Sequence, residues 1–378
     1  MKIVIAPDSF KESMTAMEVC YHVEKGFRKV FPNANYLKIP IADGGEGTVQ
    51  AIIDATDGKL IKKKVTGPLG SLVEAFYGIT GDEKTAVIEM AAASGLHHIP
   101  REHRNPLLTS TRGTGELILD ALNHGVERIV LGLGGSATND GGTGMASALG
   151  IAFYDENGEE LLMQGDSLNQ IRSMDVTGLD HRLKHMRIEA ACDVTNPLVG
   201  HLGASAVFGP QKGATPEMVA YLDMGLNQLG DVIQEFMNLN VKNIPGAGAA
   251  GGLGAGVIAF LNGRLKNGIE TVLDIVNFES VSQDADLVIT GEGRIDSQTI
   301  QGKAPIGVAK RAKQYNIPVI GLAGSLGIGY ERIYEYGIDA VFSIVNGVST
   351  LDEALLHAKE NVEITSENIA RSLKLKKF

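Results

Sequence analysis

Cysteine is scarce in this chain, which has only Cys20 and Cys192 among 378 residues. Two cysteines are too few for the disulfide framework that stabilises many small secreted proteins. No apolar run approaches the roughly 18 residues of a membrane span, and the sequence enters a strand-like segment at Lys2 without a charged and then apolar leader. We therefore expect a cytoplasmic protein.

Positive charge is also in short supply. Lysine and arginine together number 34 against 45 aspartates and glutamates, so the formal net charge is −11. The tail Lys374-Leu-Lys-Lys377 is a short basic block that does not offset the acidic total. This balance argues against a surface for nucleic acid or for an anionic membrane. An anionic substrate must then be bound by basic residues placed locally.

The phosphate-binding motif of P-loop NTPases, Gly-x-x-x-x-Gly-Lys-Ser/Thr, is missing as well. The nearest approach is at Gly302-Lys303, where Ser297 occupies the first glycine position and Ala304 the last position.

Glycine, by contrast, is concentrated in one run. Residues 132–144 contain six glycines in thirteen positions, after the apolar run 128–131 and before the helical pattern 144–150. In such a strand, loop and helix, backbone N–H groups and a helix N-terminus can converge on a phosphate. Ser136 to Asp140 carry side chains suited to contacting a ligand. Phosphate chemistry is therefore the first hypothesis.

Two other interpretations of this run remain open. Gly132-x-Gly134-x-x-Ala137 fits the short dinucleotide fingerprint, with Asp155 where a ribose-binding acid would lie, but residues 136–140 separate the second glycine from the helix. The run could also be a turn that only lets a helix pack on a sheet. A second run, 245–256, also has six glycines but no side chain able to do chemistry, which favours helix packing there.

Strand and helix patterns alternate at both ends of the chain. The capping boxes Thr15-x-x-Glu18 and Thr350-x-x-Glu353 open helices. These patterns predict an α/β fold with a doubly wound parallel sheet of about five strands. The strands are expected at residues 3–6, 36–41, 287–290, 318–322 and 340–344.

The middle of the chain has a different pattern. Residues 59–90 give closely spaced strands that suit antiparallel pairing, and Thr215-Pro216 opens a long amphipathic helix. We expect a mixed α/β domain at 61–275 inserted into a Rossmann-like domain formed by 1–60 and 276–378. The active site is expected in a cleft between these domains.

Polar clusters follow several of the expected strands, at the edge of the sheet where ligands bind in such folds. Each cluster alone could be a helix cap or a turn, and each lysine alone a solvated surface residue. Carboxylates beside cations near an anion-binding loop are what phosphoryl transfer requires. The clusters are 8–11, 43–46, 192–197, 208–213 and 291–296, with Lys303 beyond the last.

Four other candidate residues are given ordinary structural interpretations. His97 and His98 lack a third ligand nearby in sequence, which favours a surface loop over a metal site. His22 is expected on the surface of the first helix. Cys192 is expected to be a buried small side chain rather than a nucleophile, because no histidine is near it in sequence.

Seven motifs occur in order along the chain. They are Asp8-Ser-Phe-Lys11, Ala42-Asp-Gly-Gly-Glu-Gly-Thr48, Glu89-Met-Ala-Ala-Ala-Ser-Gly-Leu96, Gly132 to Gly144, Cys192-Asp-Val-Thr-Asn-Pro197, Phe208-Gly-Pro-Gln-Lys-Gly213 and Gly291-Glu-Gly-Arg-Ile-Asp296. Taken as an ordered set, these motifs closely resemble the bacterial type I glycerate kinases over about residues 1–375. The resemblance implies ATP-dependent phosphorylation of D-glycerate in a two-domain α/β protein, usually at the 2-hydroxyl to give 2-phosphoglycerate and ADP. Glu12 departs from the family, which often has glycine there.

Alternatives are phosphorylation at the 3-hydroxyl, a dinucleotide-dependent hydroxy-acid oxidoreductase and a sugar-acid-binding regulatory protein. The expected partners are D-glycerate and ATP with Mg²⁺, and the expected assembly is a monomer or a homodimer.

The candidate site residues divide by role. Asp193, which ends a strand and has Asn196 close by in sequence to orient it, is the first choice for general base. The other catalytic candidates are Lys11 and Asp296. Mg²⁺ is expected to be held by Asp296 or Glu292. The substrate-binding candidates are Asp8, Ser9, Lys11, Asp43, Glu46, Arg112, Asn139 and Asp140. The phosphate-binding candidates are Gly134, Gly135, Ser136, Lys212, Gly291, Arg294 and Lys303.

Overall fold

The computed structural model describes residues 1–375, so the last three residues, which include part of the basic tail, lie outside the description. The chain divides into two compact units. The first unit comprises Met1–Asp43, Gln50–Asp57 and the chain from Ile269 onward, and the second comprises Gly44–Val49 and Gly58–Gly268. The boundaries expected at residues 60 and 275 stay predictions.

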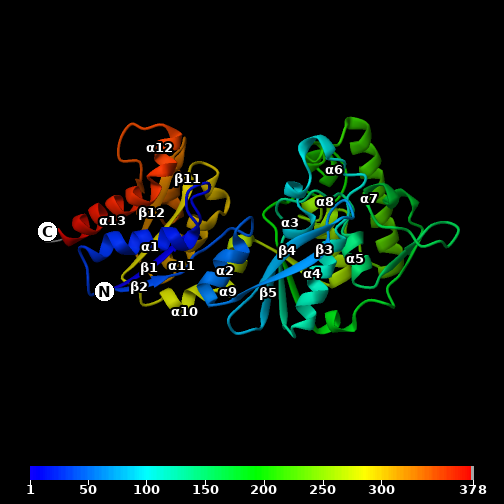
Figure 1. Ribbon diagram of the computed structural model, residues 1–378, viewed down its shortest axis with the longest axis horizontal. Coiled ribbons are helices and arrows are strands. Elements are labelled where there is room, and N and C mark those ends of the chain that lie inside the picture. The colour runs from blue at the N-terminus through cyan, green and yellow to red at the C-terminus, as the bar shows by residue number, and fades with distance from the viewer. Residues whose placement is uncertain (376–378) are drawn as a thin grey trace. The chain divides into compact units, whose positions relative to one another are not determined.

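The first unit contains a single five-stranded sheet (Figure 1). All its strand pairs are parallel, in the order β13-β12-β11-β1-β2. Its elements are β1 (Lys2–Pro7), α1 (Ala16–Arg28), β2 (Asn35–Lys38), most of α2 (Thr48–Thr56), α9 (Gly268–Ile275), α10 (Phe278–Ser282), β11 (Leu287–Ile295), α11 (Ala304–Lys313), β12 (Val319–Leu326), β13 (Ala340–Ser343), α12 (Leu351–Leu356) and α13 (Ala358–Lys374).

Helices cover both faces of this sheet. The odd-numbered residues Ile3, Ile5 and Ile289 form one buried cluster with side chains of α1 and α13, because alternate strand residues share a face. The helix α11 packs against β1 and β11 without joining that cluster, so it lies on the other face. The termini of α1 and α12 are fixed by the two expected capping boxes, at Thr15 and Thr350.

Two details of the first unit differ from expectation. The strand β11 continues to Ile295, so Glu292 and Arg294 lie within a strand rather than after it. His22, expected at the surface, is partly buried between α1 and α13, where its Nδ1 is 2.7 Å from Glu363 Oε1.

The second unit contains a six-stranded mixed sheet in the order β10-β9-β6-β5-β4-β3 and a two-stranded sheet. The strands β3, β4 and β5 pair antiparallel, as residues 59–90 predict, whereas β5, β6, β9 and β10 pair parallel. Its elements are β3 (Lys59–Thr66), β4 (Leu72–Ile79), β5 (Thr85–Glu89), α3 (Ala91–Ser94), α4 (Arg112–Asn123), β6 (Arg128–Gly132), α5 (Thr143–Ala148), β7 (Ala152–Tyr154), β8 (Ser173–Asp175), β9 (Arg187–Ala191), α6 (Ala204–Phe208), α7 (Pro216–Met237), α8 (Ala249–Leu261) and β10 (Arg264–Lys266).

The register of the parallel strands brings three strand ends to one level. Glu89 at the end of β5 pairs with Gly132 at the end of β6, which pairs with Ala191 at the end of β9. The segments that follow these three residues therefore begin at the same edge of the sheet. This edge carries the glycine-rich run, which follows Gly132.

The second glycine-rich run begins α8 and packs against the first. A side chain added at Gly251 would meet Thr138 O at 2.0 Å, and one at Gly256 would meet Gly141 O at 2.7 Å. The helix-packing interpretation of this run fits these contacts, because only glycine allows two backbones so close.

The predicted fold class, a doubly wound parallel sheet with a second mixed α/β domain, is confirmed. Within residues 1–375, none of the helices combines the length and the hydrophobicity that a membrane crossing requires.

Candidate functional site

Three carboxylates gather at the carboxyl ends of β1 and β11 in the first unit. The register pairs Pro7 with Gly291, and the Asp8 amide donates to Gly291 O at 2.8 Å, so Asp8 lies beside Glu292. Burial, and next the negative charge of Asp43, raise the pKa of Asp8 to about 7. The pKa of Glu292 is also raised, chiefly by burial, although Thr299 and Lys303 oppose the shift. We call Asp8, Asp43 and Glu292 the acidic end.

The cationic candidates of this unit are divided between the acidic end and the surface. Lys303 Nζ lies 3.6 Å from Glu292 Oε2, while Thr299 Oγ1 donates to Glu292 Oε1 at 2.6 Å. Arg294, by contrast, is two-thirds exposed and pairs with Asp296 at 3.1 Å. The structure therefore brings Lys303 to Glu292, but it turns Arg294 and Asp296 toward each other.

The loop after β1 carries Ser9 and Lys11. The Ser9 amide donates to Asp8 Oδ1 at 2.6 Å, and Lys11 is exposed. Glu12, where the family often has glycine, has a left-handed backbone with φ 67°. Glycine adopts this conformation without strain, which explains the preference. The loop thus keeps the glycine-like turn although a carboxylate occupies it.

A divalent cation fits the chemistry of the acidic end, because Mg²⁺ prefers carboxylate oxygens. Among residues 1–375, however, no three or more His, Cys, Asp or Glu side chains are arranged as a ready metal site. Mg²⁺ usually takes only one or two protein carboxylates and completes its shell with water and substrate phosphates. The carboxylates therefore fit a Mg²⁺ that arrives with a nucleotide, and they do not form a resident metal cage.

In the second unit the glycine loop 132–144 exposes backbone and buries side chains. Gly134 and Gly135 are exposed, whereas Ser136 to Asp140 are buried. This overturns the expectation that the side chains of residues 136–140 face a ligand. Among the described residues, the amides of Gly134 and Gly135 donate no hydrogen bond within the protein. They remain available to an anion.

Asp140 holds the loop from inside. Its Oδ2 accepts from the amide and hydroxyl of Thr111, both at 2.7 Å, and from the Gly144 amide at 3.2 Å, while Oδ1 accepts from Gly142 N at 3.2 Å. Burial raises the pKa of Asp140 despite these donors. Asp140 thus takes the amides at the start of α5 that we expected to bind phosphate. This geometry does not support direct substrate binding by Asp140.

Lys212 and Asn139 are buried beside Asp140. Lys212 Nζ donates to Ser136 Oγ at 2.8 Å and to Thr138 O at 2.6 Å, and burial lowers the pKa of Lys212 to about 7. Asn139 Nδ2 donates to Ser205 Oγ at 3.1 Å. The structure therefore brings Ser136, Asn139, Asp140 and Lys212 together underneath the loop, where they fix its shape.

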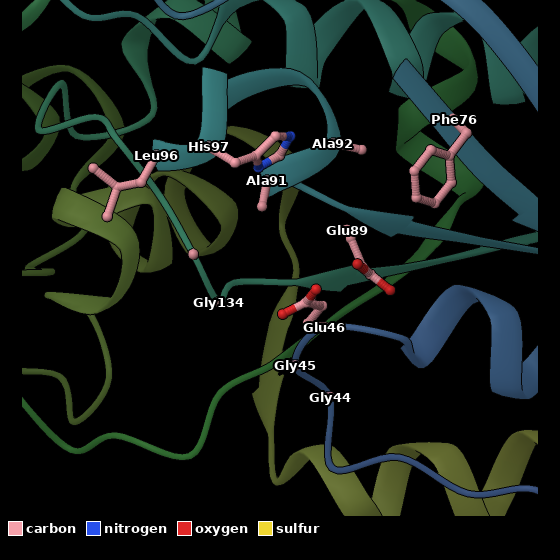
Figure 2. Close-up of a pocket in the computed structure, with 12 residues that line it drawn as sticks. Gly44, Gly45, Glu46, Phe76, Glu89, Ala91, Ala92, Leu96, His97 and Gly134 are labelled. Atoms are coloured by element: carbon pink, nitrogen blue, oxygen red, sulfur yellow. The ribbon is translucent and has the colours of Figure 1, made fainter. Parts of the chain in front are cut away.

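A cavity of about 490 Å³ lies at the carboxyl ends of β5 and β6, within the second unit (Figure 2). Its backbone lining comes from Gly44, Gly45, Gly132, Gly134 and Gly135. Its larger side chains are Glu46, Phe76, Glu89, Leu96 and His97. Among all the residues that line the cavity, the sequence predicted a site role only for Glu46, Gly134 and Gly135.

Two carboxylates share this cavity. Glu89 Oε1 accepts from the Val49 amide at 2.9 Å. Burial raises the pKa of Glu89, and the negative charge of Glu46 raises it further, while the hydrogen bond from Val49 opposes the shift. Figure 2 shows the carboxyl groups of Glu46 and Glu89 directed into the same space, with Phe76 and His97 above them in the view. His97 lies in a short 3-10 turn and is exposed overall. Partial burial of its ring, and next the charge of the neighbouring His98, lower the pKa of His97. The surface-loop interpretation of this pair holds, although His97 also lines the cavity.

Asp193 lies after β9 and is exposed. Its Oδ1 accepts from Asn267 Nδ2 at 2.8 Å and from the Gly268 amide at 2.9 Å. Asn196 Nδ2 donates to Leu202 O at 2.8 Å, so the role of Asn196 in orienting Asp193 stays a prediction. Cys192, next to it, is partly buried, which raises the pKa of its thiol and fits the structural interpretation.

Arg112 is separated from the other candidates of the second unit. It opens α4, pairs with Glu116 at 3.3 Å and lines a different, smaller cavity with Ser110 and Gln164. The structure therefore does not bring Arg112 to the cavity that Gly134 lines.

Comparisons with known proteins find glycerate kinases as relatives along nearly the whole chain. The model of the glycerate kinase family matches residues 3–374. A glycerate kinase from Bacillus subtilis is 57% identical over 377 residues, which span 100% of this chain and 99% of the relative. A glycerate 2-kinase from Escherichia coli is 57% identical, covering 99% of this chain and 98% of its own. The crystal structure of a candidate glycerate kinase 2 from Salmonella typhimurium LT2 superposes with a TM-score of 0.93 at 55% identity, covering 99% of this chain and 98% of that one.

Proposed function

Because this chain belongs to the glycerate kinase family, we propose that it transfers the γ-phosphoryl group of ATP to the 2-hydroxyl of D-glycerate. The products are 2-phosphoglycerate and ADP. The observation that carries this choice of hydroxyl is the full-length likeness to a relative named as a glycerate 2-kinase. We further propose a cytoplasmic enzyme whose partners are these small molecules, as a monomer or homodimer.

The glycine loop supports the nucleotide half of the reaction. The exposed amides of Gly134 and Gly135 are free to donate to phosphate oxygens, and backbone amides in glycine-rich loops are common phosphate ligands. Ser136 and Lys212 support those amides from beneath, because Lys212 ties Ser136 to the carbonyl of Thr138. Gly291, Arg294 and Lys303 are the corresponding phosphate candidates of the first unit.

Mg²⁺ would be held at the acidic end, where it would neutralise negative charge that develops on the transferred phosphoryl group. We favour Glu292 over Asp296, because Glu292 lies beside Asp8 and Asp43, whose charges act on the same site, whereas Asp296 pairs with the exposed Arg294. Either Asp8 or Asp43 would supply a second carboxylate oxygen in this proposal.

Asp193 is proposed to accept the proton of the glycerate hydroxyl as its oxygen attacks the γ-phosphorus and ADP leaves. Asn267 and Gly268 position this carboxylate through its Oδ1. Lys11 and Ser9 are proposed to bind the glycerate carboxylate, since Lys11 is exposed and carries the charge that a carboxylate requires.

Phosphorus NMR of a reaction with ATP, Mg²⁺ and D-glycerate tests this function. We expect the resonance of 2-phosphoglycerate to grow with that of ADP. Formation of 3-phosphoglycerate would refute the choice of hydroxyl, and the absence of any phosphoglycerate would refute the activity. L-glycerate in a parallel reaction is the control, and it should not be phosphorylated at a comparable rate.

A further inference from the structure

We infer that the cavity at the carboxyl ends of β5 and β6 binds the nucleoside part of ATP, with Glu46 and Glu89 accepting hydrogen bonds from the ribose hydroxyls. The inference rests on the proposed function, because it assigns one of the two substrates to a place. It also assigns that substrate to the second unit alone, since every residue lining the cavity belongs to this unit.

The size of the cavity suits a nucleoside. Its volume of about 490 Å³ falls in the range of roughly 300–1,000 Å³ for sites that bury a small organic ligand. Glycerate has three carbon atoms and would leave most of this space unfilled. The apolar lining of Phe76, Leu96, Ala91 and Ala92 suits a flat, weakly polar base better than it suits a small acid.

The charge of the cavity points the same way. Among the described residues that line it, two are glutamates and none is lysine or arginine. A carboxylate or a polyphosphate placed between Glu46 and Glu89 would be repelled, so in this inference the phosphates lie at the Gly134 edge of the cavity and not between the two glutamates. The nucleoside is the uncharged part of ATP, so it can lie there without this cost.

The two carboxylates offer the acceptors that ribose needs. A carboxylate accepts about four hydrogen bonds. Glu89 accepts from the Val49 amide through Oε1 and also interacts with the amides of Gly47 and Thr48, which leaves room for about one ribose hydroxyl. Glu46 is exposed and makes no hydrogen bond or ion pair among residues 1–375. Ribose hydroxyls are donors, and hydrogen bonds from neutral donors to a carboxylate are among the stronger ones. The paired glutamates thus match the 2′- and 3′-hydroxyls.

The rim of the cavity provides for the phosphates. Gly134 and Gly135 line it and have free amides. A side chain at Gly134 would meet only Gly45 Cα, at 3.6 Å, which is an ordinary contact. By contrast, a side chain at Gly141 would meet Leu229 Cδ2 at 2.2 Å. The fold requires glycine at 141, whereas at 134 the space is left for something other than the protein.

Calorimetric titration with ADP tests the assignment in the variant Gly134→Val. We expect the Kd of ADP to rise at least about tenfold, because the added side chain occupies the cavity, while the melting temperature stays within about 2 °C. Gly347→Val is the matched control, since Gly347 has an ordinary φ and no atom within 4 Å of an added Cβ. It should bind ADP as the native chain does.

A second titration identifies the ribose contact. Native protein should bind 2′-deoxy-ADP or 3′-deoxy-ADP roughly tenfold more weakly than ADP, the size expected for one hydrogen bond to a charged group. In Glu46→Ala the difference should largely vanish. If the loss persists in both Glu46→Ala and Glu89→Ala, the ribose lies elsewhere and the inference is wrong.

These outcomes are separable from those of the proposed function. ADP binding needs no turnover, so a protein that binds ADP at Gly134 but phosphorylates no glycerate would refute the proposed acceptor and keep this inference. If Gly134→Val leaves the Kd of ADP unchanged and raises the KM for glycerate, the cavity is the acceptor site. That result would overturn the inference and keep the proposed function.

Discussion

Buried charge is arranged in opposite ways in the two units. The acidic end of the first unit brings Asp8, Asp43 and Glu292 together, and their mutual repulsion adds to burial in raising the pKa of Asp8 and Glu292. In the second unit Asp140 and Lys212 are both almost wholly buried, but they have opposite charges, and Asp140 accepts four hydrogen bonds while Lys212 donates two.

The difference separates residues that await a ligand from residues that shape a loop. Like charges at a strand end cost folding free energy, which a bound cation recovers. A buried acid and base that are fully hydrogen-bonded need no ligand, and their removal disturbs the structure around them. We therefore expect changes at the acidic end to alter activity and metal dependence, and changes at Asp140 or Lys212 to alter stability.

The largest expected effect is the loss of turnover without metal. If the acidic end receives Mg²⁺ with ATP, excess EDTA should reduce phosphoglycerate formation by at least about a thousandfold, since metal-assisted phosphoryl transfer depends on charge neutralisation. Restoring Mg²⁺ should restore the rate, which shows that EDTA did not damage the protein. A rate in EDTA within tenfold of the normal rate would show that the acidic end does not need a cation for turnover.

The second largest expected effect is the loss of turnover in Asp193→Asn. This variant sharpens the comparison, because Asp193 belongs neither to the acidic end nor to the buried pair Asp140 and Lys212. The amide keeps the shape of the side chain but cannot take a proton, so kcat should fall on the order of 10²–10⁴-fold with little change in KM. Steady-state kinetics at saturating ATP and glycerate measure this. Asp175→Asn, at an exposed acid that also accepts a backbone N–H bond, is the control. If kcat falls by less than about fivefold, another residue must be the general base.

Most strands of the first sheet could be predicted from the sequence, although β2, expected at 36–41, spans Asn35–Lys38. Apolar runs, capping boxes and turn residues are local signals, so Thr215 caps α7 as expected. The length of β11 was missed, because Glu292 and Arg294 look like loop residues until Ala323 and Ser325 of β12 pair with them.

The cavity could not be predicted from local patterns. Its side chains come from segments as distant as Glu46, Phe76, Glu89 and His97. The pairing of β4 with β5 and the hydrogen bond from the Val49 amide to Glu89 help to bring these segments together. Glu89 had one signal, since it opens a motif of the family resemblance. The role of Asp140 was missed for the same reason, because its main donor, Thr111, lies 29 residues away.

Lys212→Met tests the second half of the comparison. The change removes the charge of Lys212 that interacts with Asp140 and leaves Ser136 Oγ and Thr138 O without their donor, so we expect a loss of about 2–4 kcal/mol in the free energy of unfolding. Urea denaturation followed by circular dichroism measures this. Lys242→Met is the control, because the ammonium of Lys242 pairs with the exposed Asp231. The control should lose less than about 1 kcal/mol, and an equal loss in both variants would remove the distinction.

Asp8→Asn should give the smallest effect, a gain in stability that depends on pH. The folded pKa of Asp8 is about 7 against an ordinary value of 3.8, so between these values the folded state binds more protons than the unfolded state. Stability from this group therefore falls as the pH rises from about 4 to 7 and stays low above 7. The uncharged amide removes that loss.

In metal-free buffer we expect the melting temperature of Asp8→Asn to rise by about 2–5 °C at pH 8 and to be nearly unchanged at pH 4.5. Asp54→Asn, on α2, should show no such pH dependence. If Asp8→Asn instead melts below the native protein at pH 8, the acidic end is not under mutual repulsion, and its carboxylates resemble the balanced charges of the second unit.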